Sequence, residues 1–187
     1  MEYPTYLIHY GIPGQKWGVR RFQNKDGTYT DLGKEIRNKQ NNYIKVANSL
    51  SDKEFDLFND KKGAHKKREE DIRQTKQYFR NQPNYRDSQI VVSKHGNVTL
   101  ASKEFNEYIN EWNIGWATNP KARGTGVTQK NIKETIEKIR EVSKLPISAT
   151  IAQENIASQK TALKAGFKDV GYTRMSDGRV MKRYLYK

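Results

Sequence analysis

One short stretch combines the residue types that can hold a phosphate group. It reads Pro-Lys-Ala-Arg-Gly-Thr-Gly-Val-Thr from position 120 to position 128. Gly124 and Gly126 would let the main chain approach an anion without a Cβ in the way, and Arg123 adds a fixed positive charge. If a helix begins here, its first N–H groups lack intrahelical partners and its dipole is positive at this end. The stretch predicts a phosphate-binding turn, although a Gly-x-Gly pair alone also fits an ordinary tight turn.

The flanking elements supply the geometry that such a site needs. Trp112, Ile114 and Trp116 alternate ahead of the turn and predict a strand over 112–118, which Pro120 ends. Behind the turn, apolar residues at helical spacing predict a long helix: Ile132, Ile136, Ile139 and Val142. A strand, a glycine turn and a helix in this order place backbone N–H groups where an anion fits.

A second informative segment lies downstream of this helix. Residues 145–152 are mostly apolar and predict a buried strand. Asn155 is then the expected N-cap of a short helix that carries Ile156 and Leu163 and stops at Gly166.

Together the two segments resemble the hallmarks of the GNAT acetyltransferase superfamily. The first is Pro120-Lys-Ala-Arg-Gly-Thr-Gly126, and the second is Asn155-Ile-Ala-Ser158 running to Lys164-Ala-Gly-Phe167. The resemblance is specific over about residues 112–170 and weaker from Tyr43 onward.

The resemblance implies a mixed α+β fold, in which helices flank a central, mostly antiparallel twisted sheet and an irregular extension precedes it. It also implies acetyl-CoA as the co-substrate for transfer to an amine. The implied cofactor-binding residues are Trp116, Ala117 and Thr118 beside the pantetheine, Arg123, Gly124, Thr125, Gly126, Val127 and Thr128 around the pyrophosphate, and Asn155 and Ser158 downstream.

Two positions depart from the family pattern. Thr128 stands where the turn commonly has Gly or Ala, which adds a Cβ but also a hydroxyl near the phosphate. Ala162 stands where many members have a Tyr that is proposed to protonate the departing thiolate. Members with a similar second segment often lack this Tyr as well, so its absence leaves catalysis open.

Two further residues are candidates for acid and base catalysis. In the implied reaction a neutral amine attacks the thioester, a base or water removes a proton, and strand N–H groups polarise the carbonyl oxygen. Glu111, at the entrance of the strand before the turn, is the candidate base, and an exposed strand-edge carboxylate is the alternative. Tyr172 is the candidate acid, and a packing role in the terminal hairpin is the alternative.

The remaining patterns predict the elements around this site. Tyr43–Val46 fits a strand, and Ser51-Asp-Lys-Glu54 has the form of a capping box at the start of a helix. Residues 65–82 suit a charged helix with a narrow buried stripe through Ile72 and Phe79. Two hairpins are also expected, over residues 89–100 and 167–186.

The first stretch, residues 1–42, differs from the rest, residues 43–187, which we expect to form the acetyl-CoA-binding domain. Residues 9–21 read His-Tyr-Gly-Ile-Pro-Gly-Gln-Lys-Trp-Gly-Val-Arg-Arg and resemble a short motif of structural and head-associated proteins of tailed bacteriophages. Trp17 and Phe22 lie within a basic cluster, which suits docking on a phage structural protein, another acidic partner or nucleic acid. A local mini-core packed against the main domain is the alternative.

Composition limits the partners and the chemistry. The 187 residues carry a formal charge of +14, which favours polyanionic partners such as nucleic acid. The chain has no cysteine, and its three histidines lie in unrelated contexts, so we expect neither thiolate chemistry nor a metal site. No apolar run reaches the ~20 residues of a membrane span. We therefore expect no membrane partner, and a place in the bacterial host cytoplasm or in the virion.

These patterns lead to three hypotheses. The first is a phage-encoded, virion-associated N-acetyltransferase of the GNAT fold that modifies an amine, such as a protein lysine or N-terminus. The second is a virion structural or interaction protein that keeps the fold without turnover, which Ala162 in place of Tyr favours. The third is a free nucleic-acid-binding regulator, whose DNA affinity would depend steeply on salt.

Overall fold

The computed structural model describes residues 22–59, 61–81, 89–105, 110–175 and 177–186. The chain forms two compact units, residues 1–35 and 36–187. In the smaller unit, Gln23 bridges to Tyr29 across a turn in which Gly27 has a φ of 85°. The whole N-terminal motif, residues 9–21, lies outside the described residues. The larger unit carries the sheet and the candidate site.

The first helix, α1, spans Asp31–Ser49. Tyr43–Val46 lies inside it, so the strand predicted there is wrong. The reason is that buried side chains follow a helical period over a longer window: Ile36, Tyr43, Val46, Ala47 and Leu50. This stripe outweighs the local preference of Tyr, Ile and Val for strands. The helix also runs through position 42, where the sequence places the domain boundary, and that boundary stays a prediction.

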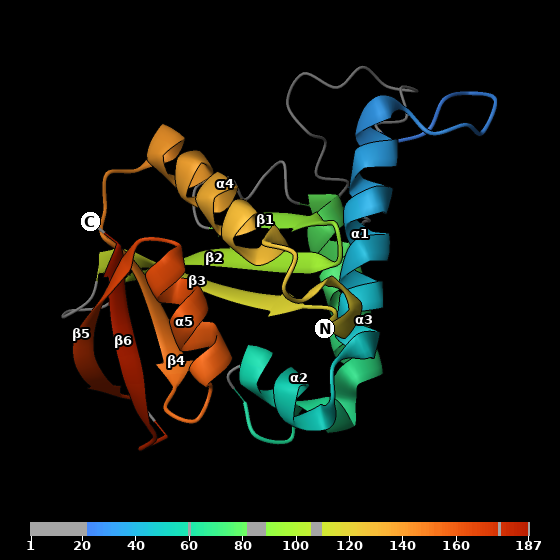
Figure 1. Cartoon of the computed structure of the whole chain (residues 1–187). Helices are drawn as coiled ribbons and strands as arrows, with labels where there is room; N and C mark the ends of the chain where they lie inside the picture. Colours follow the sequence, from blue (N-terminus) through green and yellow to red (C-terminus); the bar gives the residue numbers. More distant parts are fainter. Residues whose placement is uncertain (1–21, 60, 82–88, 106–109, 176, 187) are drawn as a thin grey trace, which may run out of the picture. The chain divides into compact units, whose positions relative to one another are not determined.

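Six strands form one sheet in the order β1-β2-β3-β4-β6-β5. Their bounds are β1 Gln89–Lys94, β2 Asn97–Phe105, β3 Asn110–Thr118, β4 Ile147–Ala152, β5 Phe167–Arg174 and β6 Val180–Tyr186. Neighbouring strands are antiparallel except β3 and β4, which run parallel. The β1–β2 and β5–β6 pairs confirm both predicted hairpins. The mostly antiparallel sheet with flanking helices is the predicted α+β fold (Figure 1).

The remaining helices are α2 Asp52–Phe58, α3 Arg68–Asn81, α4 Val127–Val142 and α5 Ile156–Lys164, with 3₁₀ turns η1 Ala64–Lys67 and η3 Pro120–Ala122. Ser51 and Glu54 form the predicted capping box of α2. Ile72 and Phe79 are buried on α3, as predicted, whereas Val142 at the end of α4 is exposed. No helix within the described ranges is both long and apolar enough to cross a membrane.

One hydrophobic core joins α4 and α5 to the sheet. Its members come from both helices and from every strand: Ile90, Ala101, Trp112, Ile114, Ile132, Ile136, Ile139, Ile147, Ala149, Ile151, Ala162, Ala165, Phe167 and Tyr184. The core residues of β3 are Trp112 and Ile114, and those of α4 recur every three or four residues, so each element buries one face. This packing fixes the start of α4 relative to the end of β3.

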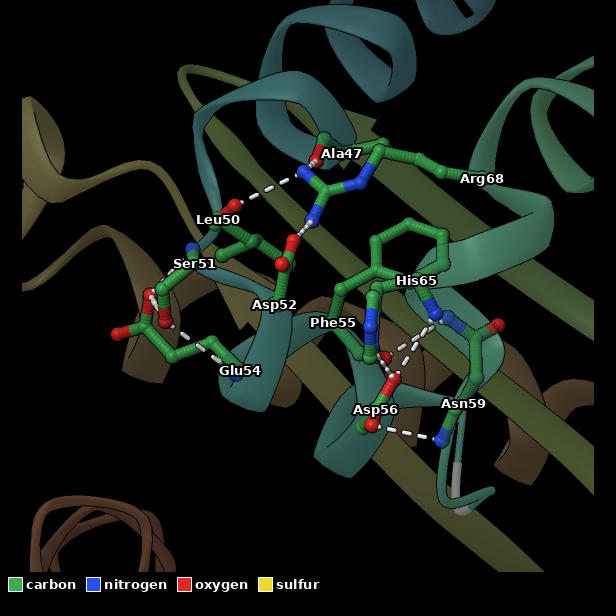
Figure 2. A network of polar contacts seen from close by, with 11 residues as sticks. Ala47, Leu50, Ser51, Asp52, Glu54, Phe55, Asp56, Asn59, His65 and Arg68 are labelled. Carbon is green, nitrogen blue, oxygen red and sulfur yellow. Dashed lines mark hydrogen bonds and ion pairs between the residues drawn. The ribbon is translucent and has the colours of Figure 1, made fainter.

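A polar network holds α2 in place beside α1 and α3 (Figure 2). The Arg68 guanidinium donates to the carbonyls of Ala47 and Leu50 and to Asp52, and it lies 4.5 Å over the Phe55 ring. Phe55 is fully buried. Because the carbonyls lie in the last turn of α1 and just after it, and the ring belongs to α2, a single side chain fixes both elements.

The same network contains a carboxylate that responds to acid. Asp56 on α2 accepts hydrogen bonds from the N–H groups of Gly63 and His65 and contacts the His65 ring at 2.8 Å. Burial by itself would raise the pKa of Asp56, but these hydrogen bonds lower it from 3.8 to about 2. The ionised carboxylate therefore stabilises the fold above about pH 4, and this contribution is lost as the pH falls toward about 2.

Asp56→Asn is expected to remove this acid sensitivity. The stability difference between wild type and variant should shrink as the pH falls from about 5 to about 2.5, because the wild-type carboxylate becomes protonated. Urea unfolding at a series of pH values measures this difference. Asp31→Asn is the control, since Asp31 is an exposed carboxylate that pairs with Lys34 at the surface. A difference for Asp56→Asn that stays constant with pH would contradict the prediction.

Candidate active site

The glycine turn connects β3 to α4 as predicted. Gly124 and Gly126 both have a φ of 79°, in the left-handed region that favours glycine. Gly126 is the N-cap residue of α4, and no side chain caps the helix there. A Cβ added at either glycine would meet no heavy atom within 4 Å. The main chain of the turn is therefore accessible to a ligand.

The turn also presents a run of unused backbone donors. Within the described part of the chain, no hydrogen-bond acceptor is paired with the N–H groups of residues 124–129. The first bond of the helix runs from the Lys130 N–H to the Gly126 carbonyl at 3.2 Å. Free N–H groups and the positive end of a helix dipole together attract an anion. The turn accordingly fits a diphosphate.

The strands β3 and β4 pair at only one end. Their register covers Trp112 opposite Ile147 and Asn113 opposite Ser148, and the Trp112 N–H donates to the Pro146 carbonyl at 2.9 Å. Beyond these pairs the described parts of the two strands have no common register and diverge (Figure 1). Backbone groups of alternate residues point to the same edge of a strand, so those of Trp116 face the opening. An extended molecule with amide groups fits along this edge.

The end of β3 carries the residues predicted to line the pantetheine. Trp116 packs its side chain against the core, so its main chain is the part that faces the opening, whereas Ala117 is buried and its carbonyl points to Asn97 on β2. The hydroxyls of Thr118 and Thr128 lie 2.8 Å apart. Thr128, which departs from the family pattern, thus ties the first turn of α4 to the end of β3.

Two fully buried amides anchor this region, and the sequence patterns assign neither to the site. Asn97 Nδ2 donates to the Ala117 carbonyl at 2.8 Å and to Thr118 Oγ1 at 2.9 Å. Asn97 Oδ1 accepts from Asn131 Nδ2 at 2.8 Å, which joins β2 to α4. In the sequence, Asn97 is simply a hairpin-turn residue. The one signal for Asn131 is a polar residue directly beside the apolar stripe of α4.

The guanidinium of Arg123 already has a carboxylate partner. Its Nη2 lies 2.7 Å from Glu54 Oε1 on α2, and Nε and Nη2 lie 3.4 Å from the Thr118 carbonyl. The Arg123 side chain is 47% exposed, and the Glu54 side chain is 36% exposed. The sequence predicts Glu54 as a helix cap and gives no sign of this second contact.

The second predicted segment lies at the start of α5. Asn155 caps the helix by accepting a hydrogen bond from the Ser158 N–H at 3.2 Å, as predicted for a cap. This helix start directly follows β4, just as the glycine turn follows β3, so each diverging strand leads to a helix N-terminus. Ala162, in place of the family's Tyr, is fully buried in the core, whereas Ile156 and Leu163 are exposed.

Glu111 is buried at the start of β3 and only 6% exposed, so it is not the exposed strand-edge carboxylate of the alternative interpretation. Its carboxylate contacts Arg183 Nη2 on β6 at 2.5 Å and accepts from the Ser148 hydroxyl on β4 at 2.7 Å. Asn113 donates to Ser148 and Thr150 on the same side. A polar cluster therefore lies where β3 and β4 begin to diverge, on the face opposite the α4 core.

Tyr172 lies far from this cluster in the strand order. It is on the edge strand β5, with β6 between it and β4, and its side chain is 61% exposed. Lys182 Nζ lies 5.6 Å from the centre of its ring. The structure does not bring Tyr172 together with Glu111 or the glycine turn. Its role as an acid stays a prediction.

Comparison with protein families gives one match over most of the chain. The model for the acetyltransferase (GNAT) domain matches residues 43–168. The chain belongs to the GNAT acetyltransferase family. The match includes both hallmark segments and the diverging strands. A comparison with curated proteins finds no match.

Solved structures with TM-scores above 0.5 share the GNAT fold at low sequence identity. The GNAT domain of PAT from S. lividans is 12% identical with a TM-score of 0.55, over 79% of this chain and 85% of that one. The YncA protein of Salmonella typhimurium, solved with its cofactor acetyl-CoA, is 14% identical with a TM-score of 0.53, over 84% and 89%. A GnaT-family protein from Bordetella pertussis is 16% identical with a TM-score of 0.42. This match covers 51% of the present chain and 59% of the length of the Bordetella protein.

Proposed function

We propose that this GNAT domain transfers an acetyl group from acetyl-CoA to an amine. The observation that carries the proposal is the opening between β3 and β4, which leads to a glycine turn with unpaired N–H groups. Acetyl-CoA supplies a thioester that is reactive toward neutral amines. The protein's own contribution is to bind, orient and desolvate the reactants.

Different residues of the chain would bind different parts of the donor. The N–H groups of residues 124–129 would hold the diphosphate, and the main chain at Trp116 would pair with the amides of the pantetheine arm. Asn155 and Ser158 stand at the second helix start, and Asn155 keeps its capping role. Free strand N–H groups near the point of divergence would polarise the thioester carbonyl.

The proposal is tested first by binding and then by turnover. Isothermal titration calorimetry with acetyl-CoA should give saturable binding near one equivalent, with desulfo-CoA or CoA as competitors. Release of free thiol is then followed with panels of small amines, peptides with a free N-terminus and lysine peptides. The absence of any acetyl-CoA binding would refute the proposal.

Glu111→Gln tests the candidate base. If Glu111 removes the amine proton, kcat should fall by about 100-fold or more while the dissociation constant for acetyl-CoA stays unchanged. Ser148→Ala is the matched control, because it removes a hydrogen bond to the same carboxylate and leaves its charge. An unchanged kcat in Glu111→Gln would assign Glu111 to structure, through its contact with Arg183.

A second function is favoured by two observations. Ala162 leaves the family's acid position without a hydroxyl, and the Glu111 carboxylate is already held by Arg183 and Ser148. Both suit a GNAT-fold protein that binds acetyl-CoA or a partner without turnover. Binding of acetyl-CoA without thiol release for any amine in the panels would favour this alternative.

We further propose that the chain is phage-encoded and that its N-terminal segment docks it on a structural protein of the virion. The support is the motif over residues 9–21, with Trp17 beside Arg20 and Arg21. Deleting residues 1–30 removes this motif and keeps α1, which begins at Asp31. The deletion should abolish incorporation into virions and preserve acetyl-CoA binding. Normal incorporation of the deleted protein would refute docking by this segment.

A further inference from the structure

The contact between Glu54 and Arg123 links α2 to the turn that would hold the donor. Glu54 Oε2 accepts from both the N–H and the hydroxyl of Ser51 at 2.9 Å, while Oε1 contacts Arg123 Nη2 at 2.7 Å. One carboxylate therefore caps α2 with one oxygen and holds the guanidinium of the turn with the other.

Glu54 is a fixed anion in this position. Burial by itself would raise its pKa, but the hydrogen bonds from Ser51 and the charge of Arg123 lower it, so the carboxylate is ionised at neutral pH. Helix α2 is itself anchored, because Phe55 is buried and Arg68 binds the end of α1 and Asp52. The carboxylate thus stays beside the turn even when Arg123 moves away.

An ion pair of this kind is exchangeable. Both side chains are partly exposed, and pairs in such surroundings contribute little to stability because solvent screens them. A diphosphate at the N–H groups of residues 124–129 offers Arg123 a partner of higher charge than a single carboxylate. The same diphosphate would also be repelled by Glu54.

We propose that Glu54 competes with the donor's diphosphate for Arg123 and thereby weakens donor binding and speeds product release. The inference rests on the proposed acetyl-CoA site. In this role Glu54 is a positioning residue that acts through Arg123 and takes no part in the chemistry. As a result, the domain would bind CoA more weakly and exchange product CoA for acetyl-CoA faster.

Glu54→Gln is the test, since Gln at this helix position keeps the capping box and loses the charge. The dissociation constant for acetyl-CoA should fall by about three- to fivefold, which is the strength of a partly exposed ion pair that Arg123 no longer has to leave. The KM for acetyl-CoA should fall in parallel without a rise in kcat. Asp52→Asn is the matched control, because it removes the same charge from the same helix but its partner is Arg68. It should leave the dissociation constant unchanged.

A double-mutant cycle separates the contact from the general charge of α2. In an Arg123→Gln background, which itself weakens binding, Glu54→Gln should lose most of its effect, because no guanidinium remains to compete for and only the direct repulsion of the diphosphate persists. Binding that is unchanged or weaker in Glu54→Gln, or an equal gain in Asp52→Asn, would overturn the proposal. If neither wild type nor any variant binds acetyl-CoA, the proposed function fails and the competition fails with it. If the wild type binds acetyl-CoA but Glu54→Gln does not bind it more tightly, only the proposed competition is refuted.

Discussion

Gly126→Asp is expected to raise the dissociation constant for acetyl-CoA by at least about 100-fold. The substitution places a carboxylate at the N-cap of α4, among the N–H groups that would hold the diphosphate. The new side chain can itself accept those N–H groups, and its charge repels the ligand. Each tenfold loss corresponds to about 1.4 kcal/mol, so two such effects together reach this magnitude.

The fold should survive this change. A Cβ at position 126 meets no heavy atom within 4 Å, so the cost is the left-handed φ of 79°, about 1–2 kcal/mol. Gly178→Asp is the matched control: its φ is 85°, its Cβ position is equally open, and it lies in the turn between β5 and β6. Gly178→Asp should unfold at a urea concentration similar to that of Gly126→Asp, and it should bind acetyl-CoA as the wild type does.

Calorimetry and urea unfolding on the two variants distinguish the outcomes. If Gly126→Asp and the wild type bind acetyl-CoA with equal affinity, the glycine turn is not part of the donor site. A DNA titration on the same proteins addresses the third hypothesis. DNA affinity that depends steeply on salt and survives Gly126→Asp would favour a nucleic-acid-binding role that is independent of the turn.

Asn97→Ala is expected to lower the free energy of unfolding by about 2–3 kcal/mol. Asn97 is fully buried, and its amide satisfies Ala117, Thr118 and Asn131 at once. Removing it leaves buried polar groups without partners, which costs more than the lost bonds themselves. Because Thr118 in turn contacts Thr128, the start of α4 should loosen and acetyl-CoA should bind more weakly.

Asn113→Ala serves as the matched control for this prediction. Asn113 has the same side chain and also donates to two partners, the hydroxyls of Ser148 and Thr150, but it is only half-buried. Its loss should cost about 1 kcal/mol, since water can replace the bonds. Urea unfolding gives both values, and equal costs would show that the Asn97 network has no special role in holding the turn.

The sequence predicts the glycine turn well because its requirements are local. A left-handed φ calls for glycine at positions 124 and 126, and the alternating strand and periodic helix around them are visible in about thirty residues. The same holds for the Ser51 capping box and the Asn155 cap, which depend on residues three apart. The prediction of a strand at Tyr43–Val46 is wrong because a window of four residues does not reveal the longer helical stripe of α1.

The contacts that turn these elements into a site join residues far apart in the chain. Glu111 meets Arg183 across 72 positions, and Glu54 meets Arg123 across 69. No local pattern encodes such pairs, because they arise when strand order places β6 beside β4 and packing places α2 beside the turn. Thus the sequence alone determined the family, the fold and the position of the glycine turn, since backbone conformation and periodicity are local. Only the tertiary structure decided which side chains face that turn, because burial and charge pairing depend on elements that the chain brings together.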